Sequence, residues 1–245
     1  MKIIGSFVSP YVRKVLAVLE WKGIDYEVDP ITPFFGNDEF ARLSPLRRIP
    51  VLVDEDFVLT DSSVICAYLE DIRPTPAILP ADPKGRARAR WFEEYADSRL
   101  GDVFIWSLFY QKIVHPLVWG EPGDQTRIDK ALTVDAPREL AYLEGELGAG
   151  DWLCGDFGLA DISVASFFRN AAYAGFEVDR TRWHGVAAWL DRCFAQPVFE
   201  TLLRYEDIQR SVSIGGRRQA LADAGVRLTE TSMAVREPRK GVMPL

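Results

Sequence analysis

The sequence is poor in the residues that build disulfide frameworks and metal centres. It has 3 cysteines and 2 histidines among 245 residues. Cys66, Cys154 and Cys193 lie far apart with no Cys-X-X-Cys pair, which excludes a disulfide scaffold and argues against a structural zinc site. We therefore expect each cysteine to be a small buried hydrophobic residue, and we expect no metal and no catalytic cysteine.

Long apolar runs and an excess of positive charge are also missing. No apolar run approaches the roughly 20 residues needed to span a bilayer, and the stretch at residues 3 to 7 is too short for the apolar region of a signal peptide. The 36 acidic and 29 basic side chains give a net charge of -7, which opposes binding to nucleic acid or to an anionic membrane. We expect a cytoplasmic protein that binds neither nucleic acid nor a membrane.

The N-terminal part of the chain alternates between strand and helix patterns. Strands are predicted at residues 2 to 8, 26 to 31, 50 to 53 and 57 to 59. Helices are predicted at residues 10 to 21 and from residue 61 onward, where apolar residues recur with helical spacing. This order fits a small four-stranded mixed sheet covered by helices.

A proline-rich segment separates this part from a helical one. Four prolines fall within residues 74 to 83, where they interrupt any regular element. Beyond them we expect helices near 84 to 112, 126 to 147, 159 to 174, 185 to 195 and 197 to 205, with a kink at Pro137. The predicted domains are 1–78, 84–210 and a polar C-terminal extension at 211–245, whose role the sequence does not indicate.

The junction between the first strand and the first helix carries Ser9-Pro10-Tyr11. Proline at the first helical position leaves Ser9 as the helix N-cap, which explains the serine structurally. The same geometry would let the hydroxyl donate a hydrogen bond to an anion, such as a thiolate, above the positive helix end. Both interpretations stay open, and Ser6 is a second hydroxyl on the same strand.

Two further segments also allow a structural and a functional interpretation. Pro50 can simply open an edge strand; if the Ile49–Pro50 bond were cis, which is rare, the backbone of Ile49 could pair with an extended peptide. Asp61 and Ser62 are common N-capping residues. Alternatively, the helix start and the Ser62 hydroxyl could hold a carboxylate while Asp61 pairs with an ammonium group, as a γ-glutamyl group requires.

These features, in this order, resemble the glutathione transferase family. The resemblance covers residues 1 to 205 and is carried by SPYVRKVLAVLEWKGIDYE, RRIPVLVDEDFVLTDSSVICAYLED, ILPADPKGRARAR and WLCGDFGLADISVAS. It implies an α/β thioredoxin-like N-terminal domain and an all-α C-terminal domain. In the last segment Gly158 to Asp161 looks like the N-capping box of the family's buried helix, with Gly158 in place of the usual serine or threonine.

The resemblance implies roles for individual residues. Ser9 would activate the glutathione thiol, and Pro50 would be cis. Arg48 would contact the glycyl carboxylate beside Ile49. Asp61 and Ser62 would bind the γ-glutamyl group, although the family most often has glutamate where Asp61 stands.

The resemblance also implies a function in detoxification, the conjugation of glutathione to a small hydrophobic electrophile. Aromatic residues are expected to line the electrophile pocket: Tyr11, Phe104, Phe109 and Tyr110. Two alternatives stay open, a glutathione-dependent isomerase or ether-cleaving enzyme, and a non-catalytic glutathione-binding regulatory protein. A homodimer is expected, with glutathione as the co-substrate.

Overall fold

The computed structural model describes residues 1–240, which form two compact units. The α/β unit contains residues 1–76 and 197–240, and the helical unit contains residues 77–196. The helical unit therefore ends earlier than the expected boundary at residue 210. Residues 197 to 210, which we expected to complete the helical domain, belong to the α/β unit.

The α/β unit is built on a mixed four-stranded sheet with the order β2-β1-β3-β4. Its strands are β1 (Lys2–Ile4), β2 (Glu27–Asp29), β3 (Val51–Asp54) and β4 (Phe57–Thr60). β1 and β2 are parallel, while β3 is antiparallel to both β1 and β4. The predicted small mixed sheet is confirmed, as is the thioredoxin-like class of this unit.

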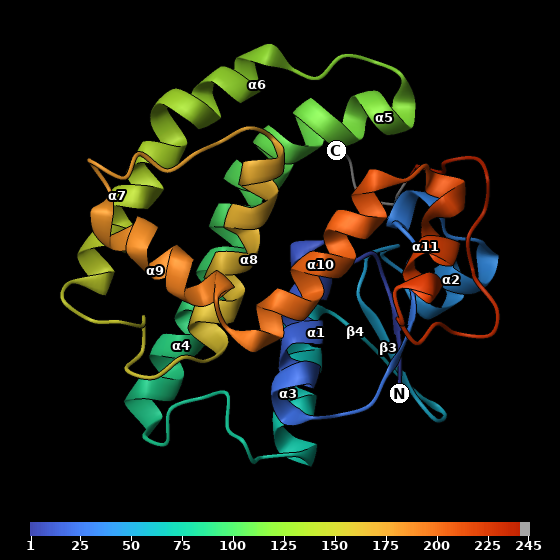
Figure 1. Ribbon diagram of the computed structural model, residues 1–245, viewed down its shortest axis with the longest axis horizontal. Helices are drawn as coiled ribbons and strands as arrows, with labels where there is room; N and C mark the ends of the chain where they lie inside the picture. Colours follow the sequence, from blue (N-terminus) through green and yellow to red (C-terminus); the bar gives the residue numbers. More distant parts are fainter. Residues whose placement is uncertain (241–245) are drawn as a thin grey trace. The chain divides into compact units, whose positions relative to one another are not determined.

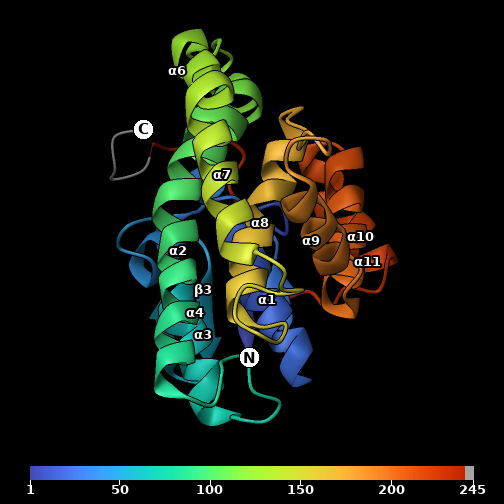
Figure 2. The same cartoon turned by 90° about the vertical axis from the view of Figure 1, so that its left-hand side faces the viewer.

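Helices pack around this sheet (Figure 1). They are α1 (Pro10–Lys22), α2 (Asp38–Leu43), α3 (Ser62–Ile72), α10 (Pro197–Ser211) and α11 (Arg217–Asp223), with 3₁₀ turns at Pro33–Phe35 and Ile214–Gly216. α1 packs against both α3 and α10, and α10 and α11 lie next to each other in Figure 2. The short helix α2 and both 3₁₀ turns were not predicted from the sequence.

The register of the strands determines which loops meet at one end of the sheet. Ile4 at the end of β1 lies opposite both Asp29 and Val51, and Val51 lies opposite Thr60. The residues that immediately follow β1, precede β3 and follow β4 are Gly5, Pro50 and Asp61. The three segments singled out in the sequence therefore leave the sheet at the same end.

The C-terminal extension is an integral part of the α/β unit. Leu228 forms a β-bridge with Val28 of the edge strand β2, and Ala234 forms a β-bridge with Gly36. The buried carboxylate of Asp29 accepts hydrogen bonds from the Ser232 hydroxyl and the Met233 backbone N–H, both at 2.7 Å. Because the Met233 side chain packs against the core cluster of Ile4, Ile31, Phe40 and Val51, the extension completes this core.

The helical unit consists of two long helical segments and two further helices. The first segment joins α4 (Pro83–Tyr95), the π-helical stretch Ala96–Val114 and α5 (His115–Trp119). The second joins α6 (Gln125–Lys130), the π-helical turn Ala131–Asp135 and α7 (Ala136–Leu147), followed by α8 (Leu159–Tyr173) and α9 (His184–Phe194). The predicted all-helical class is confirmed. The irregular turn ends just before Pro137, where a kink was expected because proline lacks a backbone N–H.

The start of α8 is organised by the buried carboxylate of Asp161. It accepts hydrogen bonds from the backbone N–H of Leu153 at 3.0 Å, the backbone N–H of Gly158 at 3.2 Å, and the Trp189 indole at 2.8 Å. The bond from Gly158 is the predicted backbone half of the capping box. A Cβ at Gly158 would lie 2.6 Å from the Ile78 carbonyl oxygen, so close packing excludes the usual serine or threonine.

We expect the substitution Asp161→Ala to lower the free energy of unfolding by about 3 kcal/mol or more, because it leaves two buried donors and one half-buried donor without an acceptor. Urea denaturation followed by tryptophan fluorescence measures this loss. Asp156→Ala, at an exposed position in the same loop, is the matched control and should change stability by less than about 0.5 kcal/mol. Equal effects of the two substitutions would contradict the role assigned to Asp161.

Candidate glutathione site

The start of α1 places Ser9 at the end of the sheet described above. Its hydroxyl oxygen accepts a hydrogen bond from the Val12 backbone N–H at 3.4 Å, so Ser9 is the N-cap of α1 and Pro10 occupies the first helical position. Accepting this bond uses a lone pair of the oxygen and leaves the hydroxyl proton able to bind an anion. The structural and functional interpretations of Ser9 are therefore compatible.

The segment before β3 combines a cis peptide bond with an exposed arginine. The Ile49–Pro50 bond is cis, as the resemblance implied. Ser44 holds the chain just before it, because its hydroxyl accepts from the Arg48 backbone N–H at 2.9 Å and donates to the Arg48 carbonyl at 2.8 Å. The Arg48 side chain remains exposed, where it can meet a carboxylate.

The start of α3 carries the acid and serine pair. Asp61 caps the helix, since its Oδ1 atom accepts from the backbone N–H groups of Ser63 at 3.0 Å and Val64 at 3.1 Å. Its backbone has a φ of 77°, a conformation that residues with a Cβ rarely adopt and that clusters at functional sites. Both capping bonds fall on one oxygen, so Oδ2 can accept from an ammonium group, and Ser62 lies buried beside it.

Two contacts bring these segments close together within the α/β unit. A Cβ at Gly5, whose φ is 155°, would lie 3.2 Å from Cβ of Ile49 and 2.5 Å from a methyl group of Val12. The backbone after β1 thus passes directly beside the cis bond. The buried Lys14 on α1 donates to the Ser63 hydroxyl at 3.0 Å, and its charge adds to the positive potential at the start of α3. Sequence analysis missed Lys14 because a single lysine in an apolar helix pattern carries no distinguishing signal.

The predicted pocket aromatics fall into different environments. Tyr11 is half-buried on α1 in the α/β unit. In the helical unit, Phe109 is half-buried with its ring centre 6.4 Å from that of Tyr173, and the buried Tyr110 lies near Trp106 at 5.7 Å. Burial raises the pKa of the Tyr110 hydroxyl, which accepts from the Trp119 indole at 3.0 Å.

Phe104 departs from the expectation that it lines a pocket. It is fully buried, with its ring centre 4.9 Å from that of Phe168 and 5.4 Å from that of Phe176. In the structure it fills the core of the helical unit and offers no surface to a ligand.

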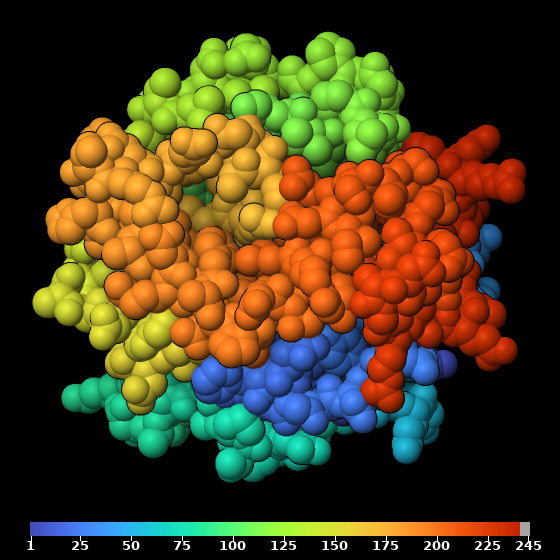
Figure 3. All heavy atoms as spheres, in the orientation of Figure 1, coloured from blue at the N-terminus to red at the C-terminus, as the bar shows by residue number. Residues whose placement is uncertain are grey.

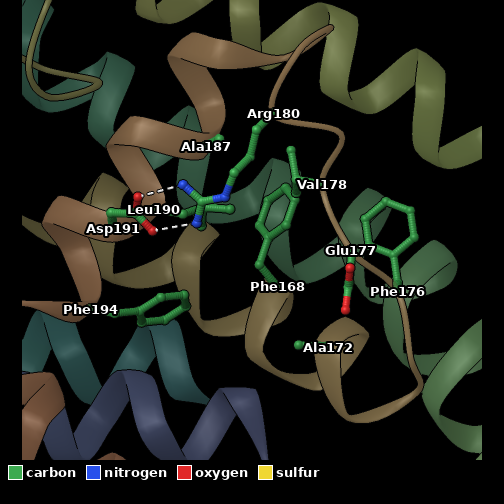
Figure 4. A pocket seen from close by; sticks show the side chains of 10 residues that line it. All are labelled: Phe168, Ala172, Phe176, Glu177, Val178, Arg180, Ala187, Leu190, Asp191 and Phe194. Atoms are coloured by element: carbon green, nitrogen blue, oxygen red, sulfur yellow. Dashed lines mark hydrogen bonds and ion pairs between the residues drawn. The ribbon is translucent and has the colours of Figure 1, made fainter.

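The helical unit also has a hollow that no predicted site residue lines (Figure 3). Its volume is about 350 Å³ and its walls come from α8, the loop that follows it, and α9. Figure 4 shows three phenylalanines around it, Phe168, Phe176 and Phe194. At one side Arg180 forms a two-pronged ion pair with Asp191, at 2.7 and 2.9 Å. None of the residues assigned to glutathione contributes to this hollow.

Two of the three cysteines are buried as expected, whereas Cys154 is not. Cys66 and Cys193 are buried and Cys154 is half-buried, and none of the three forms a disulfide. Burial, together with the nearby Asp161, raises the pKa of Cys154 to about 11 and also raises that of Cys193. Within residues 1–240 no cluster of histidine, cysteine, aspartate and glutamate side chains could hold a metal ion.

Comparison with protein-family models gives two matches that agree with the two structural classes. The model for the N-terminal domain of glutathione S-transferase matches residues 3–77, and the model for the C-terminal domain matches residues 105–197. Together they cover more than half of the sequence. The chain belongs to the glutathione transferase family.

Curated relatives support this assignment. The uncharacterised GST-like protein YibF of Escherichia coli K12 is 34% identical over 188 residues, covering 74% of this chain and 88% of YibF. Protein LigF of Sphingobium sp. strain SYK-6 is 29% identical over 230 residues, covering 77% of this chain and 87% of LigF.

Solved structures agree with the fold. A glutathione S-transferase from Rhodospirillum rubrum F11 has a TM-score of 0.77 at 27% identity, with 82% of this chain and 91% of that chain covered. The β-etherase LigF has a TM-score of 0.70 at 25% identity, with coverage of 83% and 98%. A glutathione S-transferase from Methylobacterium radiotolerans in complex with glutathione sulfonate has a TM-score of 0.69 at 28% identity, with coverage of 82% and 92%.

Among the described residues, no helix is both long enough and apolar enough to cross a bilayer.

We expect alkylation of Cys154 to be slow near neutral pH and to accelerate as the pH rises toward about 11, because the thiolate is the reactive form and the pKa of Cys154 is raised to about 11. Near neutrality the rate should be at least about tenfold below that of free cysteine. Iodoacetamide labelling followed by mass spectrometry measures it, with Cys154→Ser as the control. Rapid neutral labelling of any cysteine in the folded protein would reopen the possibility of cysteine-based chemistry.

Proposed function

We propose that this protein is a glutathione transferase that conjugates the glutathione thiolate to a small hydrophobic electrophile. The supporting observation is the meeting of Ser9, the cis bond at Pro50 and the Asp61-Ser62 pair at one end of the sheet. The backbone of Ile49 would pair with the extended tripeptide, Arg48 would contact its glycyl carboxylate, and Asp61 with Ser62 would hold its γ-glutamyl end. These groups match the charges of glutathione, which has an ammonium group and two carboxylates.

Thiol activation by Ser9 is energetically sufficient without a general base. A free thiol has a pKa near 8.5, and lowering this by about two units requires about 2.7 kcal/mol of preferential thiolate stabilisation. A hydrogen bond from a hydroxyl to an anion contributes about 1.5 to 3 kcal/mol, and a helix N-terminus contributes about 0.3 to 1 kcal/mol. The two contributions together reach the required amount.

Ser9 is a better candidate for this role than Ser6. The Ser6 hydroxyl donates its proton to the Gln209 side chain at 3.1 Å and is buried with 2% exposure. The Ser9 hydroxyl acts only as an acceptor in its capping bond and is half-buried. A ligand thiolate needs a hydroxyl that does not already donate its proton and that the ligand can reach. The Ser9 hydroxyl meets both conditions.

The chemical step follows from a bound thiolate. Its sulfur attacks an electrophilic carbon and forms a carbon–sulfur bond, while the bond to the leaving group breaks and that group departs with the electron pair. The thiol proton is lost to solvent when the thiolate forms. We propose that the half-buried rings of Trp106 and Phe109 contact the apolar part of the electrophile, whereas Tyr110 is too buried to do so.

Ether cleavage is the second candidate, and the likeness to β-etherase LigF favours it. The same thiolate would attack the carbon that carries an ether oxygen, and a phenolate would leave. Product analysis with a β-aryl ether and with a halogenated nitroarene separates the two activities, since only cleavage of the ether releases a phenol.

We also propose that the protein is a cytoplasmic homodimer that acts in detoxification. Family membership supports the dimer, and three cysteines that form no disulfide fit a reducing compartment. Light scattering should return twice the chain mass of 27.6 kDa; a value equal to one chain would contradict the dimer. Fractionation of cells that produce the protein checks its location.

We expect Ser9→Ala to lower kcat/KM for conjugation by about a hundredfold near neutral pH, because the bound thiol loses the hydroxyl that stabilises its anion. Glutathione affinity measured by calorimetry should change by less than about threefold, since the groups that hold both ends of the tripeptide remain. Ser98→Ala, at an exposed position of the helical unit, is the control and should keep most of the activity.

Two results would contradict this scheme. If the wild-type protein does not bind glutathione at millimolar concentration, both enzymatic candidates fail. If it binds glutathione but no electrophile yields product, the non-catalytic regulatory role takes their place.

A further inference from the structure

The segment Gly5 to Ser9, which carries the proposed activating hydroxyl, is held along its whole length. The Gly5 backbone N–H donates to the Asp29 carbonyl at 2.9 Å. The Ser6 carbonyl accepts from the Ser9 backbone N–H at 3.0 Å, and the Ser6 hydroxyl accepts from the Val8 backbone N–H at 3.3 Å. These bonds shape the turn, but they do not connect it to a second helix.

That connection comes from α10, about 200 residues later in the sequence. The Gln209 side chain accepts from the Ser6 hydroxyl at 3.1 Å and donates to the Pro30 carbonyl at 3.3 Å. The Tyr205 ring lies edge-on to the Phe7 ring, with 5.5 Å between centres. These two side chains of α10 therefore contact the turn just before Ser9.

A buried ion pair adds the third connection. Glu206 on α10 accepts from Nε of Arg13 on α1, and both side chains are fully buried. The same guanidinium reaches back to the Val8 carbonyl at 3.4 Å. Arg13 lies one helical turn after Ser9, and its backbone N–H donates to the Ser9 carbonyl at 2.9 Å. Glu206 thus holds both the first turn of α1 and the residue that precedes Ser9.

We infer that Glu206 and Gln209 of α10 are positioning residues that fix the Ser9 hydroxyl for thiol activation. This inference rests on the proposed function, because it concerns the orientation of the donor for the glutathione thiolate. Neither residue touches the ligand in this scheme. Glu206 acts through Arg13, and Gln209 acts through Ser6.

The physical reason is that activation depends on geometry more than binding does. A hydrogen bond to an anion weakens steeply when the donor turns away from it, whereas the two ends of glutathione are held by groups outside this turn. Loosening the turn should therefore raise the pKa of the bound thiol while leaving the affinity almost unchanged. A purely structural role of α10 would instead reduce the active fraction equally at every pH.

The experiment compares pH profiles of kcat/KM for the full-length wild type, Glu206→Gln, Gln209→Leu and the double variant Arg13→Leu/Glu206→Leu. Removing one partner of a buried ion pair can prevent folding, while replacing both partners with apolar residues is often tolerated. The double variant thus keeps the test meaningful if Glu206→Gln does not fold. Glu200→Gln, an exposed glutamate on the same helix, is the matched control.

We expect the apparent pKa of the bound thiol to rise by about one unit in the Glu206 and Gln209 variants, so that kcat/KM below this pKa falls about tenfold and recovers at higher pH. The ultraviolet absorbance of the bound thiolate should shift along the same pH axis. Glu206→Asp, which keeps the charge, should restore part of the shift, and Glu200→Gln should leave the profile unchanged.

The outcomes separate this inference from the proposed function. If the wild type neither binds nor conjugates glutathione, the proposed function fails. If the wild type is active and its folded variants titrate with the same apparent pKa, or lose activity equally at all pH values, positioning by α10 is refuted while the proposed function stands.

Discussion

The buried ion pair between Arg13 and Glu206 is the interaction on which the α/β unit depends. Such a pair adds little net stability compared with apolar residues of the same size, because both ions lose their hydration, but breaking it costs about 3 to 5 kcal/mol. Removing α10 would take away the Glu206 carboxylate that neutralises the charge of Arg13 inside the unit. This explains why residues 197 to 211 group with the N-terminal sheet rather than with the helices that precede them in the sequence.

The C-terminal extension is also held to the α/β unit through a buried charged side chain. Asp29 lies at the end of the edge strand β2, with a buried carboxylate that needs donors. Ser232 and the Met233 backbone supply them, and Arg218 lies 3.4 Å away as a counter-charge. An edge strand with unpaired backbone groups is also a site of unwanted association, and the bridge between Val28 and Leu228 covers part of it. The polar tail is therefore tied to the sheet by specific contacts.

Much of the fold was predictable because local signals determine it. Local residue patterns predicted the four strands, and the capping residues Ser9 and Asp161 predicted the starts of α1 and α8. The first two predicted strands, residues 2 to 8 and 26 to 31, were longer than the observed β1 and β2, since the pattern of apolar residues continues into the loops beyond the last paired residue. The π-helical turns were not predictable, because a change from the usual hydrogen-bond spacing leaves no mark on apolar periodicity.

The candidate site was predictable in part for a similar reason. Ser9, Asp61 and Ser62 occupy helix starts, which a sequence reveals, and the cis bond at Pro50 came only from family resemblance. Glu206, Gln209 and Lys14 were missed because their partners lie far away in the sequence or carry no distinguishing pattern. Phe104 was placed in a pocket because an aromatic residue in a helix pattern looks the same whether it faces a ligand or the core.

The division of the chain has a consequence for the chemistry it can perform. All the groups that bind and activate glutathione in the proposed scheme lie in the α/β unit, and they deliver the same thiolate whether the leaving group is a halide or a phenolate. Conjugation and ether cleavage differ only in the electrophilic carbon and in the group that departs from it. Selection between them must therefore depend on the residues that contact the electrophile rather than on the groups that activate the thiol. A change of substrate can then evolve at those residues without disturbing the contacts that α10 makes with the segment before Ser9.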